Sequence, residues 1–108
     1  MTRVKSGVLV SAALRHANIM LIDCVLARRG DADAGAIFVH IDALDGRHKL
    51  LARSLNAEGQ YDWHIITNTE WVDAEAASTR LAAEMKMDQD AFIIAVYDTE
   101  ARNPFDAL

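Results

Sequence analysis

The spacing of apolar and polar residues predicts two helices and five strands along this chain. With Ser6 as N-cap, apolar residues three and four positions apart predict a short helix over 7–19. Asp73 can cap a second, alanine-rich helix over 74–87. Strands bounded by turn residues are predicted over 21–29, 36–42, 49–55, 60–66 and 91–97. The last of these is apolar throughout, which is typical of a strand buried on both faces.

Loops at 30–35, 43–47 and 56–59 would each join neighbouring strands as a hairpin. The predicted cross-strand pairs are Leu26 with Val39, Cys24 with Ile41, Val39 with Leu50, Ile41 with His48, Leu50 with Ile65, and Arg53 with Asp62. This register gathers a single apolar face, and a slip of one residue would scatter it. That face consists of Ile22, Cys24, Leu26, Ile37, Val39, Ile41, Leu50, Tyr61, Trp63 and Ile65.

These elements predict an α+β fold built as a two-layer sandwich. The sheet is mainly antiparallel, has four or five strands and runs as a meander, with both helices on its apolar face. The helix over 74–87 is a crossover that delivers the last strand to the same sheet. Residues 1–108 would form a single domain, with a frayed tail over 99–108.

The opposite face of the predicted sheet is not uniformly polar, and a monomer would usually make it wetter. Its candidate interface residues are Val25, Phe38, His40, Leu51, His64 and Ile66. The first functional hypothesis is therefore a non-enzymatic domain that forms a homodimer or binds a protein partner through this face.

Charge is distributed unevenly along the 108 residues, whose formal net charge is −5. Residues 1–55 carry eight Lys and Arg against five Asp and Glu, whereas residues 56–108 carry three against eleven. No basic cluster offers the phosphate neutralisation that nucleic-acid binding needs, so a nucleic-acid partner is not expected. The apolar run near the N-terminus is too short and too interrupted for a membrane span or signal peptide, and we expect a cytoplasmic protein without a membrane partner.

The densest polar segment runs from Arg28 to Gly35 and has two functional interpretations. Guanidinium groups and the amides of a glycine-containing turn could bind a phosphate or carboxylate. The candidate residues for this anion or ligand site are Arg28, Arg29, Gly30, Asp31, Asp33 and Gly35. Alternatively, the aspartates bond the turn amides and the arginines, which gives a self-neutralising hairpin. A small-molecule or anion-binding protein, or an enzyme using this segment, is the second functional hypothesis.

Other chemistry finds little support in the sequence. The histidines, His16, His40, His48 and His64, have no metal-ligand spacing, so no metal site is expected. Cys24 falls on the apolar face, where a thiol behaves as a small hydrophobic group, and it has no partner for an internal disulfide. No nucleotide or cofactor fingerprint is present, no cofactor is expected, and no catalytic residue can be assigned.

Three segments together resemble a known family. They are Lys5-Ser6 leading into the first helix, the RRGD-x-DAG motif over Arg28–Gly35, and Met87-Asp88 followed by Asp90-Ala91-Phe92. The chain is similar to a family of small bacterial proteins, found chiefly in alphaproteobacteria and numbered 1491 among the domains of unknown function. The resemblance implies a cytoplasmic bacterial protein without an assigned activity, and it supplies no catalytic residue.

Overall fold

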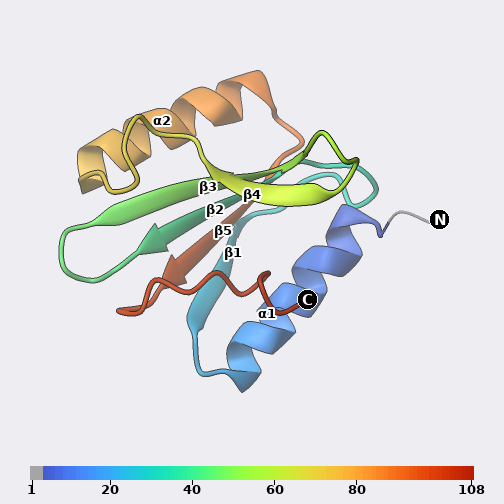
Figure 1. The fold of residues 1–108 in the computed structure, drawn as a ribbon, viewed down its shortest axis with the longest axis horizontal. Coiled ribbons are helices and arrows are strands. Elements are labelled where there is room, and N and C mark those ends of the chain that lie inside the picture. Colours follow the sequence, from blue (N-terminus) through green and yellow to red (C-terminus); the bar gives the residue numbers. More distant parts are fainter. Residues whose placement is uncertain (1–3) are drawn as a thin grey trace.

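A computed structural model describes residues 4–108, so residues 1–3 of the predicted domain lie outside the described part. Five strands form one sheet in the order β1-β5-β2-β3-β4 (Figure 1). The elements in chain order are α1 (Ser6–Ile19), β1 (Asp23–Arg28), β2 (Ile37–Asp42), β3 (His48–Leu55), β4 (Tyr61–Ile65), α2 (Ala74–Met87) and β5 (Phe92–Tyr97). The predicted α+β class and mainly antiparallel sheet are confirmed, and the one parallel pair is β2 with β5.

The predicted meander is wrong at its first step, because β5 lies between β1 and β2. Leu26 and Val39, predicted to pair directly, instead flank Ile94 of β5 in one row. Five consecutive residues of β5, from Phe92 to Val96, are buried. A strand that is apolar on both faces is best placed inside a sheet, where both of its edges are also paired.

The predicted register of β3 is wrong by one residue. Asp42 pairs with His48, so both hairpin loops contain five residues and β3 presents the opposite face from the one expected. Leu51 therefore joins the α1 side of the core in place of Leu50. The predicted Arg53–Asp62 ion pair does not form: Arg53 opposes Trp63 in the ladder, and Asp62 accepts a hydrogen bond from Asn56 Nδ2 at 2.7 Å. The pairing of β3 with β4 also differs from the prediction by one residue, since Ile65 pairs with Leu51 and not with Leu50. The two differences cancel, so β4 has the predicted orientation.

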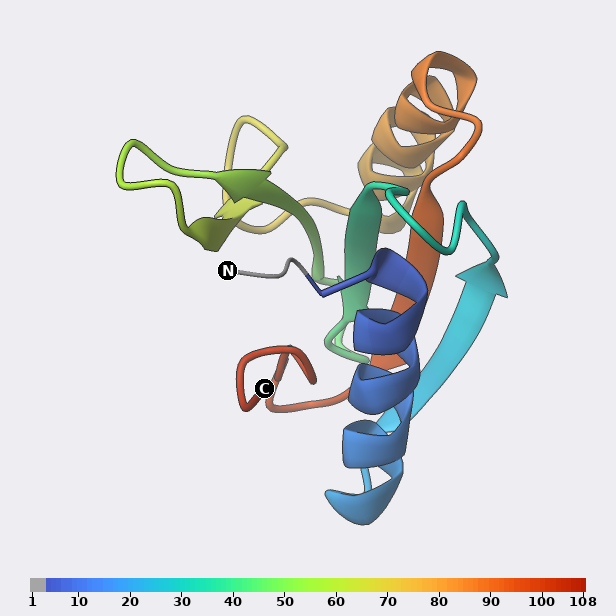
Figure 2. The ribbon, with the colours of Figure 1, turned by 90° about the vertical axis from the view of Figure 1, so that its right-hand side faces the viewer.

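The two helices lie on opposite faces of the sheet, which corrects the prediction that both share one face (Figures 1 and 2). Val10, Ala13 and Ala17 of α1 pack in the larger core with the inward residues of β1, β2 and β5. Leu81 and Met85 of α2 pack on a second cluster around Phe38 and Ile93. The second cluster exists because β5 is apolar on both faces, and its rear face needs a cover of its own.

Both helices begin close to the predicted positions. Asp73 caps α2 as expected, because its side chain accepts a hydrogen bond from the Ala76 amide at 2.8 Å. Ser6 is not an N-cap: Lys5 occupies that position, and Ser6 Oγ donates to the Gly35 carbonyl at 2.7 Å. The hydroxyl predicted to cap the start of a helix therefore connects α1 to the segment between β1 and β2.

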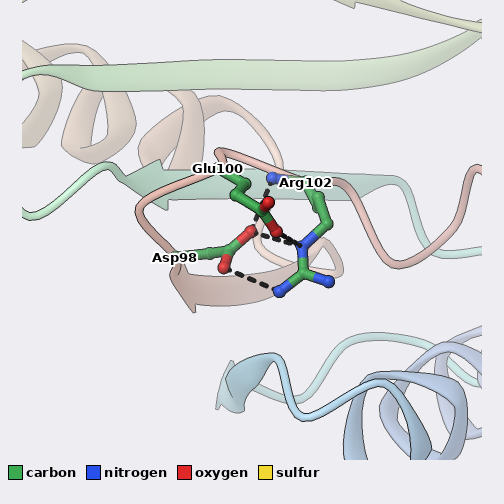
Figure 3. A network of polar contacts seen from close by, with 3 residues as sticks. All are labelled: Asp98, Glu100 and Arg102. Carbon is green, nitrogen blue, oxygen red and sulfur yellow. Dashed lines mark hydrogen bonds and ion pairs between the residues drawn. The ribbon is translucent and has the colours of Figure 1, made fainter.

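The C-terminal residues, predicted to fray, pack against the larger core. Phe105 is 5% exposed, and its ring lies 4.8 Å from that of Trp63 between centroids. Arg102 holds the start of this segment through a two-pronged contact with the Asp98 carboxylate, and it also lies 3.2 Å from Glu100 (Figure 3). Single aromatic and proline residues show no periodicity, so the pattern of the sequence could not reveal this packing.

Replacing Phe105 by Ala should lower the free energy of unfolding by about 3 kcal/mol, because it empties a buried aromatic site. Chemical denaturation measures this change, and Leu108→Ala, at an exposed position, is the control. If Phe105→Ala unfolded at the same denaturant concentration as Leu108→Ala, the tail would be frayed as the sequence pattern predicts.

Candidate functional site

The Arg28–Gly35 motif is a crossover and not a hairpin loop, because it passes the end of β5 on its way from β1 to β2. Hydrogen bonds tie it, and Ala36 directly after it, to other segments. Asp31 N donates to Asp90 O at 2.8 Å, and Phe92 N donates to Ala36 O at 2.7 Å. On its other side, Gly7 N donates to Ala32 O at 2.8 Å, in addition to the contact of Ser6 with Gly35. We call residues 28–36, together with 89–92, the crossover clasp.

Gly30 and Gly35 are required in the clasp because there is no room for a side chain. A Cβ on Gly30 would lie 2.6 Å from Phe92 N and would overlap the Asp90 carbonyl. A Cβ on Gly35 would lie 2.5 Å from the same carbonyl oxygen and 2.7 Å from Asp31 O. Both glycines therefore serve the close approach of two backbones.

Arg28 also belongs to the clasp. Its Nη2 donates to the Gln89 carbonyl at 2.5 Å, across the gap between β1 and the start of β5. Its Nη1 is buried and makes no hydrogen bond within residues 4–108. Asp31 completes the turn, since its Oδ1 accepts from the Asp33 amide at 3.1 Å. The bond from the Asp33 amide to Asp31 is of the kind expected for the self-neutralising turn, whereas Arg28 bonds a backbone carbonyl and not one of the aspartates.

Two of the six predicted anion-site residues face solvent at a groove between α1 and the crossover. Arg29 and Asp33 line it together with Lys5 and Arg15, and its volume is about 460 Å³. We call this the basic groove. Lys5 and Asp33 form an ion pair across it, with Nζ and Oδ1 3.4 Å apart. The structure thus divides the motif: Arg28, Gly30, Asp31 and Gly35 make the clasp, and Arg29 and Asp33 face the groove.

The predicted interface does not form one open face, because α2 covers part of it. Phe38 is 7% exposed and Ile66 packs beside it beneath α2. Leu51 lies on the other face of the sheet, as a consequence of the β3 register. His64 is exposed and contacts Ser54 Oγ, whereas Val25 is 47% exposed on β1.

His40 contacts His48, a pair that the sequence analysis missed because the slipped register put them on opposite faces. His40 Nε2 lies 2.9 Å from His48 Nδ1, and their ring centroids are 5.1 Å apart. Burial lowers the pKa of His40 from its ordinary value of 6.5, and the neighbouring His48 lowers it further. The structure therefore favours a neutral His40.

A second hollow, of about 580 Å³, lies between the C-terminal segment and the α1 face of the sheet. Trp63, Lys49 and His16 are among its lining residues. Lys49 Nζ lies 4.4 Å from the centre of the Trp71 ring and 3.8 Å from a Glu70 carboxylate oxygen. Arg102 also lines this hollow, and its hydrogen bond lowers the pKa of Asp98 (Figure 3).

Exposed apolar side chains gather around the start of β1. Within residues 4–108, β1 pairs with β5 alone, so its other edge is unpaired. Ile19 and Leu21 are 71% and 88% exposed, and Met20 and Val25 are also exposed. We call these four residues and the free edge of β1 the β1 edge patch. Sequence periodicity indicates which face of a sheet each residue occupies, but it does not indicate which strands lie next to each other. It therefore could not identify β1 as an edge strand.

Metal and thiol chemistry find no built site in the described part of the chain. Residues 4–108 contain no group of three His, Cys, Asp or Glu side chains placed to hold a metal ion. Burial, and secondarily the charge of Asp23, raises the pKa of the Cys24 thiol to about 11. Cys24 is thus a poor nucleophile at neutral pH.

Replacing Gly30 by Ala should cost about 3 kcal/mol of stability, because the new methyl group overlaps the backbone of residues 90–92. Gly59→Ala is the control: Gly59 has a φ of +79° and open space around it, so its cost is about 1–2 kcal/mol. Urea denaturation compares the two variants. A cost for Gly30→Ala no larger than that for Gly59→Ala would rule out the clasp as a close-packed element.

Stability should fall as the pH falls below about 6.5, because the unfolded chain takes up the His40 proton more readily than the folded chain. Thermal unfolding at about pH 7.5 and about pH 5.5 tests this, and His40→Gln should reduce the difference. The exposed His64, replaced by Gln, is the control. Asp98 does not interfere with this measurement. Its pKa is lowered from the ordinary value of 3.8, so the stability that it contributes is lost only at more acidic pH than the two values compared. If the stability of His40→Gln differed between the two pH values as much as that of the wild type, His40 would not be the group responsible.

Comparison with known proteins identifies relatives of the same fold. A crystal structure of a DUF1491 family protein from Caulobacter crescentus superposes with a TM-score of 0.84, at 21% identity over 94% of each chain. An NMR structure of a DUF1491 family protein from the same organism gives a TM-score of 0.82, at 21% identity over 96% of this chain and 94% of that one. The solution structure of protein Atu0922 from A. tumefaciens gives 0.77, at 22% identity over 95% and 92%.

No match is found among curated proteins. In the described residues, neither helix is long and apolar enough to cross a membrane. The model of the family described as "Protein of unknown function (DUF1491)" matches residues 4–106, which confirms the resemblance of the sequence, and the chain belongs to this family.

Proposed function

We propose that this protein is a self-associating, non-enzymatic domain, and that β1 of one copy pairs with β1 of a second copy. The observation that carries the proposal is the exposure of Leu21, which lies two residues before β1, a strand whose outer edge is unpaired within residues 4–108. Leu21 is 88% exposed and has a φ of +56°. In a monomer, neither the exposure of this leucine nor its backbone conformation is favourable.

Leu21 occupies the left-handed position that ends α1. Leu21 N donates to Asn18 O at 3.3 Å, and Ile22 N donates to Ala17 O at 2.8 Å. These two bonds form the Schellman motif that ends many helices, in which glycine or asparagine usually takes the left-handed position. A leucine there costs about 1–2 kcal/mol in backbone energy. Contact with a partner would offset that cost by burying the side chain.

The edge of β1 is suited to strand addition. The strand contains neither Pro nor Lys, two residues that commonly protect exposed edges. A shift in its pairing with β5 between Leu26 and Arg28 leaves Asp23–Leu26 as the regular part. The opposite edge of the sheet, β4, is a less suitable surface because Asp62 and His64 are exposed along it.

Charge favours an antiparallel arrangement of the two β1 strands. Asp23 begins the strand and Arg28 ends it, so two-fold pairing brings the acidic end of each strand near the basic end of the other. Val25, at 47% exposure, would then contact the second copy. Of the interface residues predicted from sequence, Val25 is the one retained in this proposal.

A cytoplasmic location is part of the same proposal. Cys24 is the only cysteine, and it is free. Folding of this chain thus has no requirement for an oxidising compartment.

Light scattering on a sizing column tests the self-association. At high concentration, the wild-type mass should be twice the monomer mass of 11.9 kDa. Val25→Lys should give a monomer, because the new charges would face each other across the interface, whereas Leu55→Lys, at an equally exposed strand position, should leave the dimer intact. A wild-type mass of 11.9 kDa at a protein concentration of about 1 mM would contradict the proposal, because this concentration is far above the dissociation constants of ordinary complexes.

Leu21→Asn provides a second variant that keeps the fold. Asparagine tolerates the left-handed conformation, so the isolated monomer should become more stable by about 1 kcal/mol while the dimer weakens. Denaturation at low protein concentration measures the first effect, and light scattering measures the second. A more stable protein that remains fully dimeric would show that Leu21 lies outside the interface.

A further inference from the structure

The basic groove brings together three cations from two separate parts of the chain. Lys5 and Arg15 come from the start and the C-terminal half of α1, and Arg29 comes from the crossover after β1. The hydrogen bond from Gly7 N to Ala32 O, 2.8 Å long, holds the crossover against the helix. The clasp therefore holds the backbone of the crossover, which carries Arg29, against the helix that carries the other cations.

The charge of this groove opposes the charge of the whole protein. The chain carries a formal net charge of −5, yet α1 contains no Asp or Glu. Within residues 4–108, neither Arg15 nor Arg29 makes an ion pair. The one acidic residue lining the groove is Asp33, whose partner Lys5 is itself two-thirds exposed. Two guanidinium groups are thus available to a ligand.

The other residues that line the groove have short and mostly apolar side chains. Val8, Ala12 and Ala32 line it, and Ser11 adds one hydroxyl group. Short side chains allow a ligand to approach the backbone, and arginine forks recognise the paired oxygens of phosphate groups. The volume of about 460 Å³ lies in the range of small-molecule sites.

We infer that the basic groove binds a phosphate-bearing small molecule, with Arg15 and Arg29 on the phosphate oxygens and the remainder of the ligand over Val8 and Ala12. In this arrangement Asp33 competes with the ligand for Lys5. The proposed site is separate from the β1 edge patch. Of the anion-site residues predicted from sequence, the proposal keeps Arg29 as a ligand contact and gives Arg28 and the two glycines a supporting role.

Isothermal titration with inorganic pyrophosphate at low ionic strength tests this inference. The wild type should bind in a saturable way, and added NaCl should weaken binding by screening the arginines. Arg15→Gln and Arg29→Gln should each weaken binding about tenfold, since each removes a charge-assisted contact. Arg80→Gln is the matched control, because Arg80 lies on α2 and is paired with Glu84.

Asp33→Asn separates a binding site from a general effect of charge or folding. This variant should bind pyrophosphate more tightly, because it frees Lys5 and removes a repelling carboxylate. The inference is overturned if wild type shows no saturable binding up to about 10 mM pyrophosphate. It is also overturned if Arg80→Gln weakens binding as much as Arg29→Gln does, or if Asp33→Asn leaves the affinity unchanged. A monomeric wild type that still binds pyrophosphate would refute the self-association alone.

Discussion

The backbone contact between the crossover and the start of β5 is the constraint on which the rest of this fold depends. β5 is the last strand in the sequence, yet it occupies a position between β1 and β2. For this to occur, the chain leaving β1 must pass the end of β5 at backbone contact distance. Gly30 and Gly35 allow that approach, and the bonds from Asp31 N to Asp90 O and from Phe92 N to Ala36 O hold it.

Both helices depend on the same arrangement. With β5 inside the sheet, its two apolar faces each need a cover, and α1 and α2 supply one each (Figure 2). The crossover also anchors α1 through Ser6 and Gly7. One short motif thus connects the first helix, the edge strand β1 and the inner strand β5. These connections explain its dense mixture of charged residues and glycines.

Periodicity predicted the elements and most of their faces but not which strands are neighbours. Leu26, Ile94 and Val39 do lie in one row, although the prediction placed Leu26 beside Val39 without the intervening strand. An alternating pattern reports which side of a sheet a residue occupies, and a strand inserted between two others leaves that side unchanged. The error at Leu51 arose because one residue more or less in a hairpin loop reverses a whole strand.

The candidate site was predictable only as a segment. Its composition indicated Arg28–Gly35, but Arg28 and Arg29 are adjacent in the sequence and have different roles. Arg28 binds a carbonyl of the chain, and Arg29 faces a groove whose other cations, Lys5 and Arg15, come from the first helix. The distinction depends on tertiary contacts that are absent from the local sequence.

Amide hydrogen exchange followed by NMR tests the central role of the crossover clasp most directly. If the clasp fixes β5 in the sheet, the amides of Asp31 and Phe92 should exchange only on global unfolding, with the same free energy of opening as Ile94 in the centre of β5. Exchange of the Asp31 amide through a low-energy local opening, while Ile94 stays protected, would contradict this account.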